Sequence, residues 1–507
     1  MNFAKSLMLG GAALLVATAG AQAADLPLKA KAVEYVKVCS LYGAGFYYIP
    51  GTDTCIKLGG YIRAEYAFNA GGMTETPSWG GAAGQGNRLS NNTIYRSRAD
   101  LNIDTRTATE YGVVRTYFES VFTWTTGSGT VAGGDTPGVY FAFVQFAGFT
   151  FGKAVSAFST PWHGGPGNIT SNLLGGDDTS TGINQVSYTA EFGNGVSASI
   201  SLEDQSSYRW AQSSGLSSNV TMSNVFNATG GSAATWLQGA GNGTNYTAGT
   251  SIPDIVGKIR VDQAWGLFQV SAAAHQVRAG YYNASDETSG HPSDKWGFAV
   301  LAALSLKNLP TGAGDSINLD ATYADGATRY VIGGTSPNQF AMYSNSGLAG
   351  IYQSVGFAAA PDGVFAGTNN LNGTGISTVK AWGIRGAFNH NWNPNWATSL
   401  FGAYSSVDFG GTGGALYNAA LAAQVAGFGT TYTGNPNFNI AQIGVRTAWT
   451  PVKNLTFTGE VMWMRLDQNY SGVTAGNVSP TSTKPNARYE FKDQDTVVGA
   501  VRVQRTF

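Results

Sequence analysis

The segment QVSYTAEFGNGVSASISLED alternates apolar and polar residues on both sides of a short, glycine-rich turn. Successive side chains of a strand face opposite sides of a sheet, so this alternation predicts two strands with one apolar and one polar face each. The turn Gly193-Asn194-Gly195 would join them into a hairpin. After residue 23, no apolar run approaches the ~18 residues that a membrane-spanning helix needs. Two-faced strands are therefore the elements we expect over most of the chain.

The composition suggests where such strands can be stable. Charged residues make up 12% of the 507 residues, about half the share of an ordinary soluble protein. The mean hydropathy of -0.08 is too low for a bundle of membrane helices. A membrane β-barrel, apolar outside and polar inside, has this average. The net charge of -1 argues against a general nucleic-acid binder.

Sixteen segments carry the strand signal. They lie near residues 57–68, 93–105, 111–123, 139–147, 149–155, 185–192, 196–204, 255–263, 267–275, 295–307, 316–325, 379–391, 396–408, 438–450, 454–466 and 494–507. Long polar connections such as 205–254 and 326–378 follow odd-numbered strands, and tight turns such as GNG, AWG and PVKN follow even-numbered ones. This pattern predicts an all-β fold: a sixteen-stranded antiparallel transmembrane β-barrel with short periplasmic turns and long extracellular loops.

The N-terminus predicts export from the cytoplasm. Lys5 precedes an apolar stretch from Leu7 to Ala19, and Ala21-Gln22-Ala23 has the small-x-small pattern of a cleavage site. We therefore expect a signal peptide at 1–23, a periplasmic N-terminal segment at 24–56 and the barrel at 57–507.

Cys39 and Cys55 are the only cysteines. In an oxidising compartment a nearby pair is most simply a disulfide. Two thiolates without a neighbouring histidine do not complete a tetrahedral metal site, so metal binding is the poorer interpretation. The four histidines are scattered along the chain, and we expect no metal site and no cofactor.

The last strand is predicted to close the barrel. Backbone groups in lipid need partners within the sheet, so this strand should pair with the one that begins near Lys57. Phe507 would lie in the periplasmic aromatic girdle as the terminal signal of an outer-membrane protein. The alternative, a strand that ends a soluble sandwich, fits poorly with the low charge and the signal peptide.

Three segments carry a resemblance to a known family: VEYVKVCSLYGAGFYYIPGTDTCIKLGGYIRAEY, FAFVQFAGFTFGKA and the closing VRVQRTF. They resemble the alphaproteobacterial porins of rhizobia-like bacteria, and the resemblance covers essentially the whole mature chain. It implies a trimer of sixteen-stranded barrels that pass small hydrophilic solutes, with the third long loop folded into the lumen. The sequence departs from the usual ending by placing Arg505, and not an aromatic residue, on the lipid-side parity.

Arginines on the inward parity predict a pore constriction. They come from the first three strands and the last one, near mid-height, and neighbouring strands lie about 4.8 Å apart. The predicted basic wall consists of Arg63, Arg96, Arg98, Arg115 and Arg502. The alternative is an ordinary polar lumen in which Glu65, Asp100 and Glu119 neutralise the arginines locally.

The opposing wall is expected from the third long loop, residues 156–184. Asp177 and Asp178 follow a double glycine that lets the chain turn sharply, so they could project toward the arginines. The alternative is a solvated loop tip. Arg385, Arg446 and Glu460 also have inward parity, and we expect them to line the lumen only.

The sequence therefore predicts an outer-membrane porin of a Gram-negative bacterium, a passive channel for ions and small hydrophilic solutes. We expect contacts with outer-membrane lipid and lipopolysaccharide, a homotrimer, and no enzymatic activity, because spacing alone brings out no serine or acid pair beside a histidine. The alternative is a structural or adhesive barrel with a blocked lumen.

Overall fold

The computed structural model describes residues 37–69, 84–126, 137–170, 173–177, 179, 181–204, 225–229, 246–332, 339–425, 434–474, 476–477, 479–480 and 483–507. The predicted signal peptide, 1–23, and the first part of the predicted periplasmic segment lie outside these ranges. The chain divides into two compact units, Met1–Ile56 and Lys57–Phe507.

The first unit is held together by a disulfide. Cys39 and Cys55 are bonded, with their Cα atoms 6.1 Å apart, which confirms the predicted pair. Both cysteines are buried together with Phe46. The short strand β1 (Tyr47–Tyr48) pairs with the first residues of β2 (Cys55–Phe68), so the disulfide closes a small hairpin.

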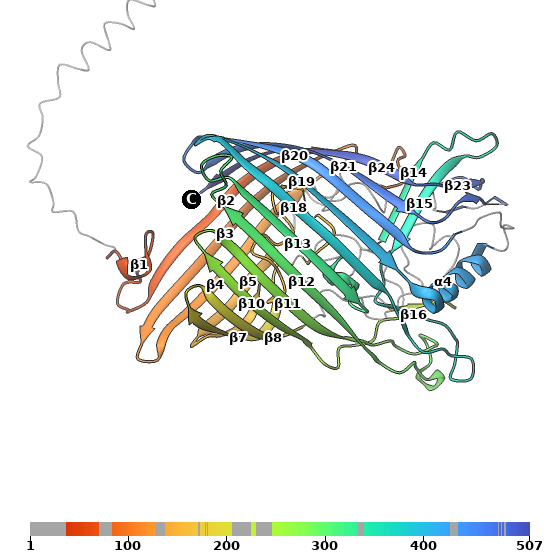
Figure 1. Cartoon of the computed structure of the whole chain (residues 1–507), viewed down its shortest axis with the longest axis horizontal. Coiled ribbons are helices and arrows are strands. Elements are labelled where there is room, and N and C mark those ends of the chain that lie inside the picture. The colour runs from red at the N-terminus through yellow and green to blue at the C-terminus, as the bar shows by residue number, and fades with distance from the viewer. Residues whose placement is uncertain are drawn as a thin grey trace, which may run out of the picture. The chain divides into compact units, whose positions relative to one another are not determined.

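A closed ring of sixteen antiparallel strands forms the second unit (Figure 1). Its strands after β2 are β3 (Thr93–Thr109), β4 (Gly112–Thr125), β5 (Gly138–Phe146), β6 (Phe149–Ala154), β7 (Ile183–Gly193), β8 (Val196–Glu203), β10 (Asp254–Gln263), β11 (Gly266–Val277), β12 (Lys295–Lys307), β13 (Ser316–Asp325), β18 (Lys380–Asn393), β19 (Trp396–Asp408), β20 (Phe438–Val452), β21 (Leu455–Gln468) and β24 (Gln494–Thr506). All sixteen predicted strands are present, and the all-β barrel prediction is confirmed.

The ring closes where β24 pairs with β2. The register runs from Tyr61 opposite Thr506 to Phe68 opposite Gly499. The Phe507 amide also donates to the Gly60 carbonyl at 3.0 Å. With this seam the barrel wall has no free edge, as a sheet surrounded by lipid requires.

The two faces of the wall differ as the alternation predicted. Large apolar side chains remain exposed on the outer face, for example Ile62, Ile200 and Val501. Charged groups such as Glu65 and Arg96 occupy the inward parity and are buried. An apolar exterior around a charged interior suits a wall that has lipid outside and polar groups inside.

Short turns join the strands at one end of the barrel. Gly195, in the turn between β7 and β8, has a φ of +72°, and a Cβ there would lie 1.9 Å from the Asp262 carbonyl oxygen. Glycine is therefore required at this position both by the backbone conformation and by the close approach of the neighbouring strand.

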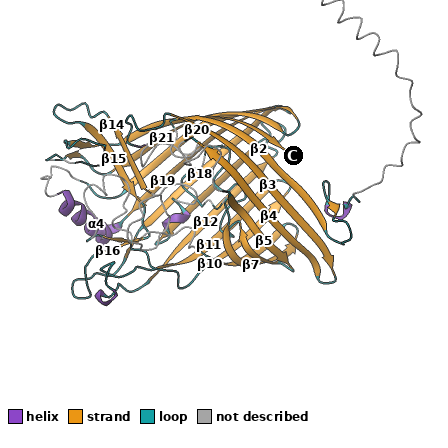
Figure 2. Cartoon of the chain, turned by 180° about the vertical axis from the view of Figure 1, so that it is seen from behind, coloured by secondary structure: helices purple, strands orange, loops and turns teal. Residues whose placement is uncertain are grey.

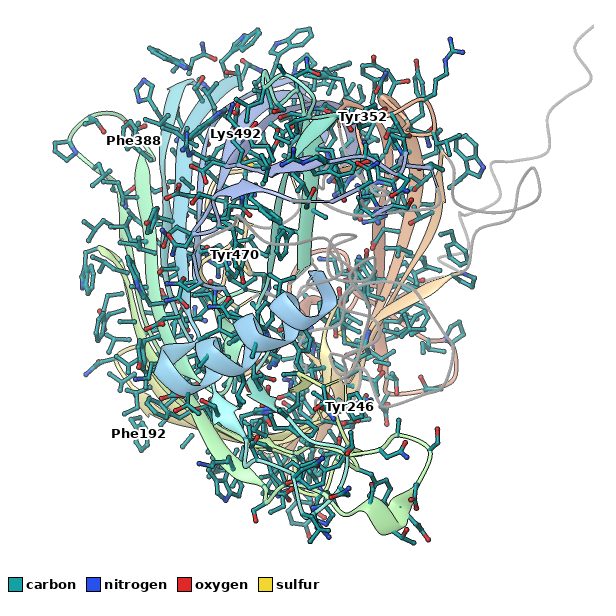
Figure 3. All side chains as sticks on the ribbon, turned by 90° about the vertical axis from the view of Figure 1, so that its right-hand side faces the viewer. Phe192, Tyr246, Tyr352, Phe388, Tyr470 and Lys492 are labelled. Atoms are coloured by element: carbon teal, nitrogen blue, oxygen red, sulfur yellow. A yellow bond between two sulfur atoms is a disulfide. The ribbon has the colours of Figure 1, made fainter. Side chains whose placement is uncertain are left out.

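The long connections build structure that the sequence did not predict. They form one sheet from β14 (Gln339–Ser344), β15 (Gln353–Ala359), β22 (Gly472–Val473) and β23 (Tyr489–Phe491), and another from β9 (Val225–Asn227), β16 (Gly363–Phe365) and β17 (Ser377–Thr378). The helix α4 (Gly410–Val425) crosses the same end of the barrel (Figures 2 and 3). Of the helices that the structure describes, none has the length and apolar character to cross a membrane.

These connections share a buried apolar cluster, which we call the loop core. Phe357 stacks on Tyr470 with ring centroids 5.0 Å apart, and Phe491 lies 5.9 Å from Phe357. Inward-facing side chains of the wall, including Leu301 and Ala324, belong to the same cluster. The segment 326–378, predicted as a long polar loop, is thus partly a packed apolar structure inside the long-loop end of the barrel.

Lysine substitutions on neighbouring strands test the two faces. Ile200 is 58% exposed on the outer face of β8, and Thr189 on β7 is half-buried with its hydroxyl 2.8 Å from that of Ser199. We expect Ile200→Lys to lower the free energy of unfolding in phospholipid bilayers by about 2–4 kcal/mol, because lipid solvates the ammonium poorly. Thr189→Lys should cost only about 0.5 kcal/mol. Equal costs in urea titrations followed by tryptophan fluorescence would contradict the assigned faces.

Candidate functional site

The predicted arginines lie on the inner faces of adjacent strands. Arg63 is on β2, Arg96 and Arg98 are on β3, Arg115 is on β4 and Arg502 is on β24. These four strands are consecutive in the ring, because β24 pairs with β2, β2 with β3, and β3 with β4. We refer to the inner surface that carries these five residues as the arginine wall.

Glu65 joins two arginines of this wall. Arg96 Nε donates to Glu65 Oε2 at 2.5 Å, and Arg502 Nε donates to Glu65 Oε1 at 2.5 Å. Both Glu65 and Arg96 are buried. Arg63, two residues before Glu65, donates to the side-chain oxygen of Gln504 across the seam at 2.9 Å. One carboxylate therefore serves two guanidiniums at the closing seam.

A second shared carboxylate lies on β3. Asp104 accepts hydrogen bonds from Arg106 at 2.9 Å and from Arg115 at 3.0 Å. Arg115 also donates to Gln145 on β5 at 3.0 Å. Neither Asp104 nor Arg106 was among the predicted site residues, because the register between strands decides which neighbours meet.

Arg98 has a different environment. Its Nε donates to the Thr123 hydroxyl at 2.9 Å, and its Cζ lies 5.6 Å from the centroid of the Tyr140 ring. Among the residues that the structure describes, it makes no ion pair. Since neither of these contacts carries a negative charge, no described residue compensates the positive charge of Arg98 by direct contact.

The other two predicted acids do not pair with arginine in the described part of the chain. Asp100 accepts from Asn102 at 3.3 Å, and Glu119 accepts from the Tyr117 hydroxyl at 2.6 Å. Of the three acids that were expected to neutralise the arginines, Glu65 alone contacts guanidiniums of the wall among the described contacts.

The third long connection, of which residues 155–170, 173–177, 179 and 181–182 are described, runs inside the barrel. Its Trp162 indole donates to Asp320 on β13 at 2.6 Å, and its Leu174 amide donates to Gln442 on β20 at 2.8 Å. The amide of Thr170 donates to Glu460 on β21 at 2.8 Å. Because these partners are inward side chains of the wall, the predicted folding of the third loop into the lumen is confirmed.

Arg385 and Glu460, predicted only to line the lumen, hold this loop in place. Arg385 pairs with Asp320 at 2.8 Å and donates to the Asp177 carbonyl at 2.7 Å. Glu460 accepts from the amides of both Ile169 and Thr170, at 2.6 and 2.8 Å. Arg446, the remaining member of that predicted group, donates to the Ser399 hydroxyl at 2.9 Å.

The structure pairs Asp177 with an arginine that does not belong to the arginine wall. Its carboxylate is 0% exposed and pairs with Arg329 at 3.1 Å, and it also accepts a hydrogen bond from Ser159. Arg329 comes from the short helix η4 (Thr328–Tyr330) of another long connection. Asp177 therefore links two loops and does not project toward the guanidiniums as expected. Asp178 lies outside the described residues.

A buried set of three hydrogen-bonded side chains, Tyr330, Asp254 and His275, fixes η4 to the wall. The Tyr330 hydroxyl donates to Asp254 Oδ2 at 2.7 Å, and Asp254 Oδ1 lies 2.7 Å from His275 Nδ1. Burial, followed by the Asp254 charge, raises the pKa of the Tyr330 phenol well above its ordinary value, so it remains a donor. Sequence spacing gave no sign of this group, because its members are 21 to 76 positions apart.

Three comparisons relate the chain to known proteins. The family described as "Porin subfamily" matches residues 25–500. Porin Omp2b of Brucella suis is 33% identical over 274 residues, which is 52% of this chain and 64% of the relative. Porin Omp2b of Brucella abortus (strain 2308) is 32% identical over 288 residues, 52% of this chain and 63% of the relative. Each alignment thus spans less than two thirds of the relative.

Among solved structures that share the fold is a channel from another bacterium. The outer membrane channel DcaP of Acinetobacter baumannii superposes with a TM-score of 0.55 and 14% sequence identity. The superposition covers 91% of this chain and 99% of that one. At this identity the likeness concerns the architecture alone.

The Asp177–Arg329 pair gives a stability prediction. Arg329→Met leaves the Asp177 carboxylate buried without its cation, so we expect the free energy of unfolding to fall by about 3–5 kcal/mol. The double variant Arg329→Met with Asp177→Asn should recover much of this loss. The partly exposed pair of Arg260 with Asp262 serves as a control, and Arg260→Met should cost less than about 1 kcal/mol. Denaturant midpoints in detergent that are equal for Arg329→Met and Arg260→Met would contradict the prediction.

Proposed function

The chain belongs to the Porin subfamily, and from that membership we propose that it forms a water-filled channel for ions and small hydrophilic solutes in the outer membrane of a Gram-negative bacterium. The observation that carries the proposal is a closed barrel with an apolar exterior and an arginine wall on its inner surface. A passive channel needs a wet constriction whose width and field select solutes, and no reactive group. Membership of the family likewise implies a channel rather than an enzyme.

The constriction would lie between the third loop and the arginine wall. The third loop is bonded to β13, β20 and β21, and its Ile169 carbonyl also accepts from Arg502 of the wall at 3.2 Å. Its bonds to Asp320, Gln442 and Glu460 use backbone amides and an indole, which hold the loop against that side. The passage is then left to the side of the barrel that carries Arg63, Arg98 and Arg115.

The charge distribution supports a preference for anions. Glu65 and Asp104 are each shared by two guanidiniums, and Arg98 has no carboxylate partner among the described residues. Asp177, the acid expected to oppose the wall, is neutralised by Arg329. A lumen lined with excess positive charge raises the local concentration of anions and slows cations.

We further propose how the chain is exported, assembled and oriented in the outer membrane. Residues 1–23 would be removed as a signal peptide, and 24–56 would remain as a periplasmic segment that contains the disulfide. The channel would assemble as a homotrimer in contact with outer-membrane lipid and lipopolysaccharide. Phe507 would act as the terminal outer-membrane signal, and the long connections would face the cell exterior.

The loop core favours one second candidate, a structural barrel with a blocked lumen. Its members Phe357, Tyr470 and Phe491 fill part of the long-loop end with apolar side chains. Planar-bilayer recordings separate the two functions. Stepwise openings, grouped in threes for a trimer, support the channel, whereas silent membranes with folded protein support the blocked barrel.

Neutralising the arginine wall tests the proposed selectivity. In the triple variant Arg63→Gln, Arg98→Gln and Arg115→Gln, we expect the reversal potential in a salt gradient to shift toward that of a cation-preferring channel, because the local positive field is removed. Arg465→Gln is the matched control, since Arg465 is exposed on the outer parity of β21 and pairs with Asp493. A reversal potential that stays unchanged in the triple variant would reject the arginine wall as the selectivity element.

A further inference from the structure

Aromatic rings accompany the arginines of the wall. Arg63 Cζ lies 4.4 Å from the centroid of the Tyr61 ring. Arg115 Cζ lies 5.2 Å from the Tyr117 ring and 5.5 Å from the Phe143 ring. With Arg98 beside Tyr140, each of the three arginines of the constriction lies near at least one ring.

The position of Tyr140 depends on a local irregularity of β5. Glu119 on β4 is opposite Phe141, but the next residue, Ser120, is opposite Val139, so Tyr140 has no partner in the register. A bulge of this kind inserts one residue and changes the direction of a side chain. Here it brings the Tyr140 ring to Arg98 on the inner surface. The sequence could not show this, because FAFVQFAGFTFGKA is apolar on both parities.

The tyrosine rings do not cancel the positive charge of the arginines. A ring face attracts a guanidinium through its quadrupole, but it carries no net charge. The pair therefore presents a cation and a flat apolar surface side by side. Tyr61, Tyr117 and Tyr140 are all partly exposed, so a solute in the lumen can reach them.

Two kinds of anion would use this surface differently. A compact inorganic anion gains only from the charge of the guanidinium. A small aromatic carboxylate gains from the charge and also from contact between its ring and the tyrosine or the guanidinium plane, and such ring contacts have a preferred geometry that saturated rings do not match.

We propose that Tyr61, Tyr117 and Tyr140 determine the specificity of this channel, and that with Arg63, Arg98 and Arg115 they favour small aromatic carboxylates over compact or saturated anions. This inference rests on the proposed function and refines it by naming the class of solute.

The test compares two carboxylates of equal charge and similar size in planar bilayers that contain the full-length protein. Benzoate is planar and aromatic, whereas cyclohexanecarboxylate is saturated. Each is titrated against the chloride current, since a solute that stays longer in the constriction reduces that current at lower concentration. Benzoate should act at a concentration about three- to fivefold lower, the effect of one or two ring contacts.

Tyr140→Leu should bring the two half-blocking concentrations to within about twofold of each other, because the ring contact is lost. Tyr140→Phe keeps the ring and should keep the preference. Tyr95→Leu is the matched control, because Tyr95 is 55% exposed on the outer face of β3. If Tyr140→Leu does not assemble, Tyr61→Leu and Tyr117→Leu provide the same comparison.

The outcomes separate the two levels of the proposal. Equal block by benzoate and cyclohexanecarboxylate in a conducting wild-type channel overturns the aromatic preference but leaves the porin intact. A preference that survives in all three leucine variants overturns the assignment to these tyrosines. A wild-type protein that inserts and does not conduct overturns the proposed channel itself.

Discussion

The pairing of β24 with β2 is the interaction on which the rest of the structure depends. A strand edge surrounded by lipid would leave a row of amides and carbonyls without partners, at a cost of several kcal/mol for each group. The register that removes this edge, with Tyr61 opposite Thr506, also fixes which side chains point inward at the seam. Arg63 then meets Gln504, and Arg502 meets Glu65. The hydrogen bonds that close the wall therefore also assemble the charged face of the lumen from the two ends of the chain.

The position of the third loop is also set by the need of its backbone amides and carbonyls for hydrogen-bond partners. Loop residues such as Thr170 and Leu174 are buried where they pack against the wall, so their polar backbone groups must be bonded there. Glu460 accepts hydrogen bonds from two amides of the loop, and Arg385 donates to two of its carbonyls. Inward polar side chains of the wall therefore bind the loop backbone. The buried Asp177–Arg329 pair then joins this loop to η4. Removing one partner of such a pair is costly, whereas the intact pair mainly fixes which loops lie together.

The sequence could predict features that are imposed on each strand by itself, but not features that depend on contacts between distant segments. All sixteen wall strands could be predicted because lipid on one side and polar groups on the other impose a period of two on each strand by itself. The arginines could be assigned to the inner face for the same reason. The loop sheets could not be predicted, since β15 pairs with β23 more than a hundred residues away and no local period marks either strand. Asp177 was expected to face the arginine wall because its actual partner, Arg329, is 152 positions distant. The direction of Tyr140 could not be predicted because it depends on a bulge, which a parity count cannot locate.

Two requirements decide which arginines of the lumen have a carboxylate partner: a buried charge must be compensated, and a charge that attracts anions must not be. Guanidiniums that are deeply buried, such as Arg96 and Arg385, each have a carboxylate, because an isolated buried charge is too costly. Arg98 lies at an intermediate depth, where the solvent of the lumen can replace the missing carboxylate, and the Tyr140 ring gives it a weak but neutral partner. A carboxylate in that position would stabilise the wall further, but it would also cancel the field that attracts anions. A neutral ring holds the guanidinium in place and leaves its charge available to a solute, which is what a selective passage requires of its lining.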